Sequence, residues 1–335
     1  MVTDTLTTRP APLSRVWSGS KTIAEDVVGD DLSDVLQLHS DASAWWVMSR
    51  TEASTGVELR HAAHALDLDE LAIHDLLASD YRAKYEELGQ ARLVMTNAVS
   101  ADRKTAELSV QPVSLVVTDK ALICLVDAHR DGFHPAQLLD QRAEELSEGG
   151  VEHALQFVLA AVINTYENTA EWLEDASDEL SRALFEERPL SRGEQLRAFR
   201  LRSALSQLRR VTDPMRAVMD ELVAGQDQDS FVGRKWALIQ QQHHRVANAA
   251  DALREALASV FDTSLALADL RMNTIMKKLT GWAGIIAVPT LVTGFAGMNV
   301  SFPLDGTAVG FWLYTAVGLV AVIVLWVMFR RKDWI

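Results

Sequence analysis

Two long apolar runs dominate the C-terminal part of the chain. The first covers residues 279–298 and the second covers residues 309–329, and neither contains Asp, Glu, Lys, Arg or His. A helix of about 20 predominantly apolar residues is long enough to cross a hydrocarbon core about 30 Å thick. The pattern therefore predicts a hairpin of two membrane-spanning helices joined by residues 299–308.

Shorter apolar runs occupy the N-terminal part of the chain and are separated by turn residues. The runs that predict strands, because they are rich in β-forming residues, are 44–48, 92–96, 107–110, 113–117 and 121–126. Asp119 and Lys120 predict a tight hairpin between the last two, and helices are expected at 66–77 and 135–146. We therefore expect a small α/β domain over residues 43–150, after a polar, partly disordered lead-in over residues 1–42.

Helical periodicity takes over in the middle of the chain. Residues 151–187 and 191–222 predict an acidic and a basic helix, which together fill the segment 151–230. Residues 231–298 predict one helix of about 68 residues, roughly 100 Å long, whose first part, 231–278, is a stalk. Such a helix needs neighbouring copies to bury its apolar stripe. The expected fold class is α+β: an N-terminal α/β domain, a long helical stalk and two C-terminal transmembrane helices.

Composition narrows the classes of function. The net charge is −14, with 46 acidic against 32 basic residues, which disfavours nucleic acid because its binding relies on cationic contacts to phosphate. Cys124 is the single cysteine, so no internal disulfide can form, and its apolar neighbours predict a buried, inert thiol. The sequence has no nucleotide-binding loop, HExxH motif or catalytic-triad context, so we do not expect an enzyme.

Basic residues flank the two apolar runs. They are Lys277, Lys278, Arg330, Arg331 and Lys332. Loop 299–308 contains no Lys or Arg, and residues 1–20 show no secretory signal. Because positive flanks stay on the cytoplasmic side, we expect a cell-membrane protein with both termini, including the basic tail 330–335, in the cytoplasm and the loop outside.

These features resemble the CorA family of divalent-cation transporters. The resemblance rests on Gly297-Met298-Asn299 after an apolar helix, the short loop, the second span, the basic tail, and the segments 273–280 and 289–292. The order of the domains extends it over residues 43–335. It implies a homopentameric funnel in the lipid bilayer, with the first span of each subunit lining a pore for divalent cations and with no resident cofactor.

At the outer end of the pore, the resemblance implies a selectivity filter made of Gly297, Met298 and Asn299. Mg²⁺ gives up its water reluctantly, and a ring of Asn299 side-chain oxygens can accept hydrogen bonds from the ion's water shell. Gly297 would let the backbone turn and the chains approach closely, and Met298 would pack and hold the loop. The alternative is that Asn299 is an ordinary helix C-cap.

A stripe along the long helix is the expected pore face. Its members are Asn273, Met276, Leu279, Thr280, Ala283, Ala287, Thr290 and Gly294. Asn273 resembles the family's polar ring, and Met276 and Leu279 resemble its hydrophobic constriction, a gate that can close by dewetting. Coiled-coil packing is the alternative for these two. Thr290 can offer its hydroxyl to hydrated ions or bond its own helix backbone.

Two charged groups have counterparts in the family. The basic flanks fit a ring of cations around the inner mouth, although membrane anchoring explains them equally well. The later part of helix 151–187 is acidic, and in relatives such a helix projects toward the membrane, where it would concentrate cations; a solvated face is the alternative. Its acids are Glu167, Glu171, Glu174, Asp175, Asp178, Glu179, Glu186 and Glu187, offset by Arg182 and Arg188.

The regulatory metal site of the family is incomplete in this sequence. Relatives pair a carboxylate of the α/β domain with one on a neighbour's long helix to bind a regulatory Mg²⁺. Asp75 stands at the first position, but residues 231–250 contain no acid and have His243 and His244 instead. Asp262 remains as a second metal ligand or as part of the inner pore. We expect the histidines to be a solvated pair; as metal ligands they would suit zinc.

The leading interpretation is a homopentamer that passes hydrated Mg²⁺, with Co²⁺ and Ni²⁺ as further ions. A zinc transporter of the same superfamily is the first alternative, because both branches share the Gly-Met-Asn motif. Residues 300–305 match neither the glycine pair of the zinc branch nor the Met-Pro-Glu-Leu run of magnesium members. The second alternative is a membrane-anchored coiled-coil scaffold or signalling protein.

Overall fold

The structure, a computed structural model, describes most of the chain. The described residues are 13–50, 55–63, 66, 68, 70–77, 82–127, 132–185, 189–298, 304 and 307–335. The chain folds into two compact units. The N-terminal unit comprises Met1–Leu180 and Arg192–Ala258, and the C-terminal unit comprises Ser181–Ser191 and Ser259–Ile335.

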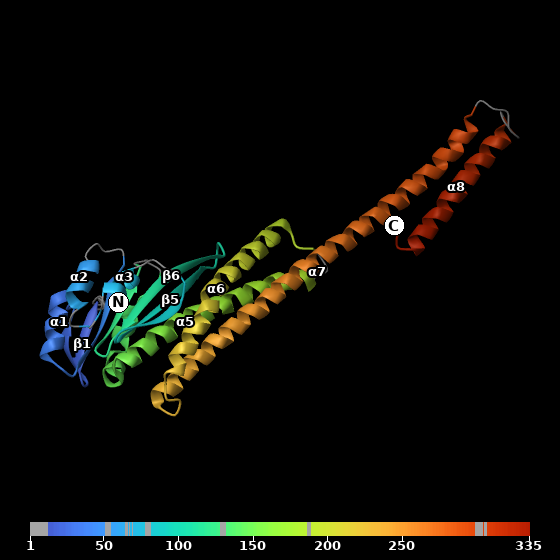
Figure 1. Ribbon diagram of the computed structural model, residues 1–335. Coiled ribbons are helices and arrows are strands. Elements are labelled where there is room, and N and C mark those ends of the chain that lie inside the picture. The colour runs from blue at the N-terminus through green and yellow to red at the C-terminus, as the bar shows by residue number, and fades with distance from the viewer. Residues whose placement is uncertain are drawn as a thin grey trace, which may run out of the picture. The chain divides into compact units, whose positions relative to one another are not determined.

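The described residues form strands and short helices in alternation, followed by long helices, in an order that can be followed in Figure 1. The strands are β1 (Ser14–Ser18), β2 (Lys21–Glu25), β3 (Ala42–Ser49), β4 (Lys84–Leu88), β5 (Ala91–Asp102), β6 (Glu107–Val117) and β7 (Ala121–Val126). The helices are α1 (Gly29–Leu38), α2 (Thr55–Ala63), α3 (Glu70–Leu77), α4 (Pro135–Gln141), α5 (Ala143–Phe185), α6 (Arg192–Ala224), α7 (Phe231–Ala296) and α8 (Ala308–Arg331).

One mixed sheet organises the N-terminal unit, with strand order β2-β1-β3-β7-β6-β5-β4. β3 and β7 are parallel, and the other neighbours pair antiparallel. The pairing of β6 with β7 confirms the hairpin expected at Asp119 and Lys120. The predicted runs 107–110 and 113–117 join into the single strand β6. The mixed architecture expected from the sequence is thus present.

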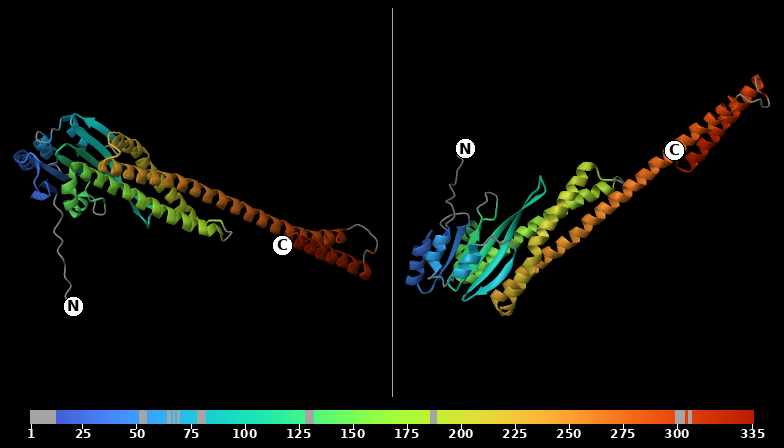
Figure 2. Two further views of the ribbon diagram at one scale, coloured as in Figure 1. Left: turned by 90° about the horizontal axis from the view of Figure 1, so that it is seen from below. Right: turned by 45° about the horizontal axis from the view of Figure 1, so that its top comes forward.

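Helices cover both faces of this sheet (Figures 1 and 2). On one face, Trp46 of β3 joins Leu36 of α1 and Leu76 of α3 in a continuous apolar core. On the other face, the Tyr166 hydroxyl of α5 donates to the carbonyl of Asn97 in β5 at 2.6 Å. Because successive strand residues point to opposite faces, strands covered on both sides must be apolar at nearly every position.

Cys124 belongs to this doubly covered region. It lies in the middle of β7 and is fully buried, and burial raises the pKa of its thiol because the charged thiolate is poorly solvated there. A raised pKa leaves little of the reactive thiolate form. The prediction of a buried, inert thiol is confirmed.

Residues 14–38 correct the expectation of a polar lead-in over residues 1–42. β1 and β2 form a hairpin at one side of the sheet, and Leu32 and Leu36 of α1 are fully buried. β1, β2 and β4, which the sequence did not predict, lie at or next to a sheet edge. Edge strands meet solvent, so charged residues such as Lys21 and Lys84 interrupt their apolar pattern. Residues 1–12 lie outside the described part of the chain.

Gly150 marks the transition from the sheet to the long helices. It has φ 70° and ψ −167° inside α5, in the left-handed half of φ space that glycine enters without steric strain. The helix expected from Val151 therefore begins at this kink. Beyond it, α6 and α7 keep the expected bounds to within a few residues.

His243 corrects the expectation of a solvated histidine pair. Its side chain is fully buried between α7 and α6, with Nε2 2.9 Å from the carbonyl oxygen of Thr212. Burial lowers the pKa of His243 because it disfavours the imidazolium. A neutral Nε2–H donating to the Thr212 carbonyl satisfies this geometry, so His243 is a core residue that joins the two helices; His244 is only half-buried.

Because of this histidine, we expect the free energy of unfolding to decrease as the pH is lowered. A pKa below the ordinary value of about 6.5 means that the neutral form stabilises the fold fully above that pH and that the contribution is lost as the pH falls toward the folded-state pKa. In detergent, His243→Gln should weaken the decrease in the thermal unfolding midpoint between about pH 7.5 and 5.5, and should lower stability at neutral pH by about 1 kcal/mol.

His39→Gln is the matched control, because His39 is exposed and its replacement should preserve the wild-type pH dependence. An unchanged pH dependence in the His243 variant would contradict this role.

Candidate functional site

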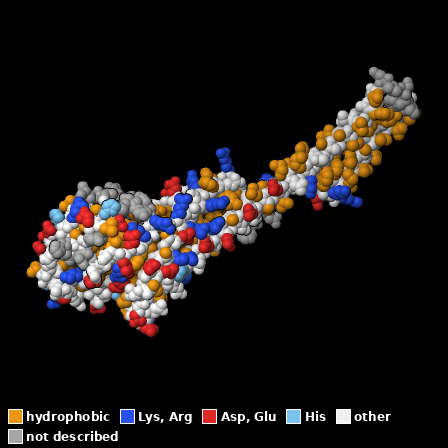
Figure 3. Space-filling view, viewed as in Figure 1, with side chains coloured by type: hydrophobic (Ala, Val, Ile, Leu, Met, Phe, Trp, Pro, Cys, Tyr) orange, Lys and Arg blue, Asp and Glu red, His pale blue; other side chains and the backbone are white. Residues whose placement is uncertain are grey.

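The C-terminal unit is built around a pair of apolar helices. α7 and α8 are the two helices among the described residues that are long and apolar enough to cross a membrane. Figure 3 shows hydrophobic side chains covering this helix pair. α8 turns back along α7 (Figure 1), so one side of α7 faces α8.

Glycines bring α7 and α8 close together. A Cβ atom added at Gly281 of α7 would lie 3.1 Å from Ile335, and one added at Gly318 of α8 would lie 3.7 Å from Val292 of α7. Ile285 is 8% exposed and lies on the same side of α7 as these contacts. Small residues that let helices approach are typical of packing in membranes. Sequence reasoning missed this face, although the spacing of the glycines could have indicated it.

The predicted pore face lies on the side of α7 that is roughly opposite the side packed on α8. At about 100° per residue, positions 283, 287, 290 and 294 lie roughly opposite 281, 285 and 292. Every predicted pore-face residue is exposed in the single chain: Asn273, Met276, Leu279, Thr280, Ala283, Ala287, Thr290 and Gly294. α8 therefore leaves this whole stripe uncovered.

Two residues shape the outer half of the stripe. The Thr290 hydroxyl donates to the carbonyl of Ile286 at 2.8 Å, so the helix backbone fixes its hydrogen and leaves lone pairs of its oxygen to accept hydrogen bonds. Of the two alternatives for Thr290, the bond to its own helix is the one observed. Pro289 lies inside α7 and has no N–H, so the carbonyl of Ile285 loses its helical donor.

The predicted filter begins at the C-terminal end of α7. The Gly297 amide donates to the Thr293 carbonyl at 2.9 Å, and the Met298 amide donates to the Phe295 carbonyl at 3.2 Å. Met298 is 55% exposed in the single chain. Asn299 lies outside the described residues, so its side chain has no position here.

The start of α8 is a tight turn. Thr307 caps the helix, its hydroxyl oxygen accepting a hydrogen bond from the Gly310 amide at 3.1 Å. A Cβ atom added at Gly310 would lie only 2.2 Å from the carbonyl oxygen of Leu304. No side chain fits at that distance, so glycine is required for the chain to enter α8 in this way.

The predicted basic ring gathers at the other end of the helix pair. Arg330 and Arg331 occupy the last turn of α8, and Lys332 is its C-cap. The chain then folds back, with Trp334 stacked on Phe329 at 5.4 Å between ring centroids. Ile335 reaches Gly281 of α7, close after Lys277 and Lys278. All five cations thus lie at one end of the pair, where they also complement the C-terminal dipole of α8.

The acidic part of α5 is only partly neutralised. Glu179 pairs with Arg197 of α6 at 2.6 Å, and Glu167 lies 3.9 Å from Arg245 of α7. These arginines come from other helices and were not counted from the sequence. The acids that remain exposed on one stripe are Glu171, Glu174, Asp175 and Asp178. Glu186, Glu187 and Arg188 lie outside the described residues.

Asp75 already has partners within its own unit. Its carboxylate lies 3.3 Å from His74 Nδ1 and 3.2 Å from Lys84 Nζ. The hydrogen bond from His74 and then the Lys84 ammonium lower the pKa of Asp75 because both favour the carboxylate. Asp262 is exposed and belongs to the C-terminal unit. No group of three or more His, Cys, Asp or Glu suited to a metal occurs among the described residues.

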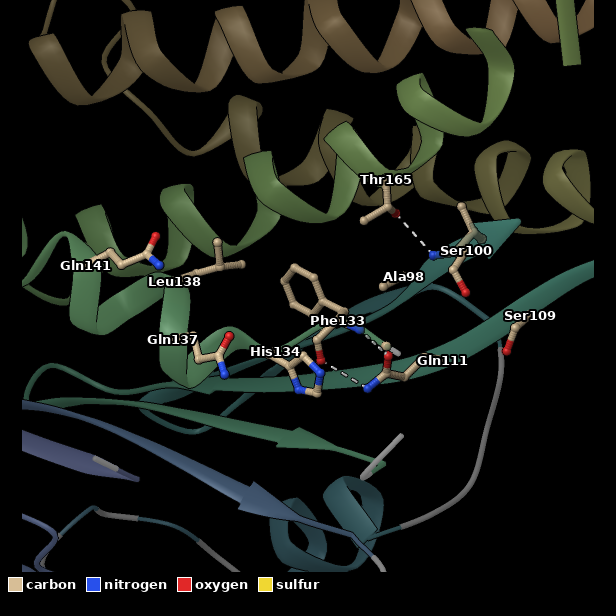
Figure 4. Close-up of a pocket in the computed structure, with 12 residues that line it drawn as sticks. Ala98, Ser100, Ser109, Gln111, Phe133, His134, Gln137, Leu138, Gln141 and Thr165 are labelled. Atoms are coloured by element: carbon tan, nitrogen blue, oxygen red, sulfur yellow. Dashed lines mark hydrogen bonds between the residues drawn. The ribbon is translucent and has the colours of Figure 1, made fainter. Parts of the chain in front are cut away.

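A cavity of about 630 Å³ lies between β5, β6, α4 and α5 in the N-terminal unit (Figure 4). Gln111 projects from β6 and donates to the carbonyl of Phe133 at 3.1 Å, while the Phe133 amide donates back at 2.6 Å. No Asp, Glu, Lys or Arg stands among the described residues that line the cavity. The hydrogen bonds between Gln111 and Phe133 hold the segment before α4 against β6.

The fold and the helix pair define a class of protein. A sheet domain followed by long helices and two apolar helices of spanning length describes a membrane protein with a large domain outside the bilayer. The chain belongs to the CorA-like Mg²⁺ transporter family, whose model matches residues 41–331. The C-terminal part of α7 and α8 are accordingly its membrane spans, and the family resemblance inferred from the sequence is confirmed.

Individual relatives agree with this assignment. The cobalt/magnesium transport protein CorA of Methanocaldococcus jannaschii is 45% identical over 83 residues, covering 24% of this chain and 26% of that protein. The protein of the same name in Thermotoga maritima is 23% identical over 312 residues, covering 91% of this chain and 87% of that protein.

Solved structures share the fold. The complete CorA magnesium transporter from Methanocaldococcus jannaschii superposes with a TM-score of 0.76 at 20% identity, covering 96% of this chain and 99% of that one. The cytoplasmic domain of ZntB from Vibrio parahaemolyticus superposes with a TM-score of 0.57 at 10% identity, covering 76% and 97%. At these identities the likeness concerns the fold and does not distinguish the ion.

The two glycines of α8 give a matched pair of variants. We expect Gly310→Ala to lower the free energy of unfolding by about 1–3 kcal/mol, because its Cβ would collide with the Leu304 carbonyl. Gly318→Ala should be nearly neutral, since its Cβ meets Val292 at 3.7 Å, an ordinary contact. Thermal unfolding of the full chain in detergent compares the two, and equal stability of both variants would contradict the tight turn.

Proposed function

We propose that this chain is the subunit of a homopentameric membrane channel that passes hydrated Mg²⁺, with Co²⁺ and Ni²⁺ as further ions. The observation that carries the proposal is the uncovered stripe of α7, which is uncharged from Leu279 to Gly294 and lies roughly opposite the face packed on α8. Two helices cannot enclose a path for ions. Several copies whose stripes face a common axis can, and family membership supports this arrangement.

The proposed filter is a ring of Asn299 side chains at the outer mouth. Asn299 follows the end of α7 at Ala296 by three residues, so each subunit would contribute one amide oxygen at the same depth. Such oxygens accept hydrogen bonds from the water of a hydrated cation. Because Mg²⁺ keeps its water shell, recognition through that shell avoids the energy of dehydration.

The proposed gate is lower in the pore, at Met276 and Leu279. These side chains are 51% and 62% exposed in the single chain, and they lie about one helical turn apart on neighbouring parts of the stripe. Rings of such side chains narrow a pore to an apolar constriction that water leaves, and a dewetted constriction blocks hydrated ions. Packing between copies at the same residues is compatible with the closed form of this gate.

Charge supports cation passage. The exposed acids of α5, Glu171, Glu174, Asp175 and Asp178, would raise the local concentration of divalent cations. The five basic residues at one end of the helix pair would keep that end on the cytoplasmic side. We infer that they also form the inner ring, where they would slow cations unless screened.

The donor set of the stripe favours Mg²⁺ over Zn²⁺. Its polar members, Asn273, Thr280 and Thr290, offer oxygen, which suits hydrated Mg²⁺. Zinc prefers nitrogen and sulfur ligands, and the stripe has neither His nor Cys. His243, one of the two histidines considered for zinc, is buried between helices. A zinc transporter of the same superfamily is the second candidate, because the Gly-Met-Asn motif is common to both.

We expect Asn299→Ala to reduce Mg²⁺ flux at least about tenfold, since losing one net hydrogen bond to the ion's water shell is worth about 1.4 kcal/mol. Flux into proteoliposomes containing a magnesium dye, repeated with a zinc dye, measures this. Asn248→Ala, at an exposed position of α7 in the N-terminal unit, is the matched control and should retain wild-type flux.

Each result has one meaning. Undiminished transport by an assembled Asn299→Ala channel would contradict the proposal that Asn299 forms the selectivity filter. Zinc entry without magnesium entry would move the chain to the zinc branch. If neither ion enters with the wild type, the membrane-anchored scaffold becomes the better interpretation.

Regulation by internal Mg²⁺ is tested at Asp75. If its carboxylate is a regulatory ligand, Asp75→Ala should make flux less sensitive to Mg²⁺ on the cytoplasmic side. Lys84→Gln should act in the opposite direction, because it removes the ammonium 3.2 Å from that carboxylate and so frees it for a cation. A loss of sensitivity in both variants would show that the ion pair supports the fold instead.

A further inference from the structure

A crevice between α6 and α7 of the N-terminal unit gathers positive charge. It has a volume of about 500 Å³ and is lined by Arg202, Arg209 and Arg210 of α6 and by Arg254 of α7. One carboxylate, that of Asp213, also lines it. Positions 202, 206, 209, 210 and 213 follow a helical repeat along one face of α6, so these side chains line the same side of the helix.

Three of the four arginines have no counter-ion among the described residues. Arg209 is neutralised, with its guanidinium 3.1 Å from Asp251 and 3.5 Å from Asp213. Within the described part of the chain, Arg202, Arg210 and Arg254 take part in no ion pair or hydrogen bond. With Asp213 and Asp251 counted against the four arginines, a protein of net charge −14 thus holds a net charge of +2 around one concave space.

The structure assigns this crevice, we propose, as a binding site for a polyphosphate anion. A guanidinium presents its donors in a planar fork that matches phosphate oxygens, often bidentately. Three converging guanidiniums suit a ligand with several negative charges more than a single phosphate. The Ser206 hydroxyl can add a neutral donor, and Leu205 and Leu257 provide apolar contact. The base of a nucleoside triphosphate would use this apolar contact, whereas an inorganic polyphosphate would not.

A small anion fits the crevice better than a second copy of the chain. The exposed acids of α5 stand on a helix, whose convex surface cannot bring several carboxylates to one concave point. In contrast, one polyphosphate can reach arginines from both walls. The inference does not depend on the ion that is transported, and its test uses no measurement of flux.

The test is binding of sodium tripolyphosphate and of ATP to the full-length protein in detergent, by calorimetry. The buffer contains EDTA and no Mg²⁺, so that chelation gives no heat, and salt at about 0.15 M screens weak surface attraction. We expect one anion per chain. Tighter binding of ATP would identify the source as a nucleotide, and tighter binding of tripolyphosphate would identify it as an inorganic polyphosphate; either supports the site.

Two triple variants locate the site. Arg202→Gln with Arg210→Gln and Arg254→Gln should weaken binding at least about tenfold, since losing a single charge-assisted hydrogen bond is worth that much. The control removes the same charge from a separate basic hollow of about 370 Å³ on α6 and the β5–β6 turn. It combines Arg103→Gln, Lys104→Gln and Arg200→Gln, and it should bind within about twofold of wild type, because long-range attraction is screened.

Three results would overturn the proposal. The first is no binding of either anion to the wild type. The second is an equal loss in both triple variants, which would mean general attraction to a basic helix. The third is loss of the oligomer in the crevice variant but not in the control variant, which would assign the arginines to contacts between copies. Size-exclusion chromatography with light scattering measures the oligomeric state for this third result.

Discussion

Every apolar side chain of a membrane-spanning helix is acceptable to lipid, so the two sides of such a helix differ mainly in the size of their residues. In this protein, Gly284 of α7 faces Phe329 of α8, Gly318 of α8 faces Val292 of α7, and Gly281 faces Ile335 just after α8, so small residues line the side of α7 that is packed within the chain. The stripe from Asn273 to Gly294 belongs to the part of α7 that α8 leaves exposed, and that part also includes Trp282, Ile286, Leu291 and Phe295. Packing on α8 therefore excludes one side of α7 from the pore we propose, and the sequence pattern of the stripe selects the pore face within the rest.

The distribution of charge complements this division. The five basic residues lie at one end of the helix pair, and exposed acids lie on α5. Between Leu279 and Phe329, the described residues contain neither. The spans themselves therefore offer no charged group among their described residues to which an ion could bind tightly. Tight binding would oppose conduction, because an ion must leave each site as readily as it enters.

The sequence predicted those parts of the fold in which one strong pattern dominates. β3, β5, β6 and β7 are covered on both faces and read as apolar runs, and α7 and α8 are long and periodic. The edge strands were not predicted, because solvent on one side permits charged residues such as Lys21 and Lys84 and these interrupt the apolar pattern. The burial of His243 was not predicted either. A polar residue in a helical repeat gives no sign of burial until the helix that packs on it, here α6, is known.

The candidate site was predictable to a similar degree. The stripe on α7 follows from its spacing, but the side taken by α8 depends on glycine contacts between segments distant in the sequence. The partners of Asp75 and Glu179 come from a strand and a helix that no local pattern connects to them. Ion pairs of this kind are set by the tertiary fold. They change the local charge by as much as the residues that a motif identifies.

Pro289 divides α7 mechanically. The missing hydrogen bond to the Ile285 carbonyl makes this the turn at which the helix bends most easily. It falls between Ala287 and Thr290, so the outermost turns can tilt while the turns around Met276 and Leu279 stay in place. A closed constriction and an intact outer mouth can then exist together. In the channel we propose, the filter at the outer mouth and the gate below it would then be mechanically independent of each other.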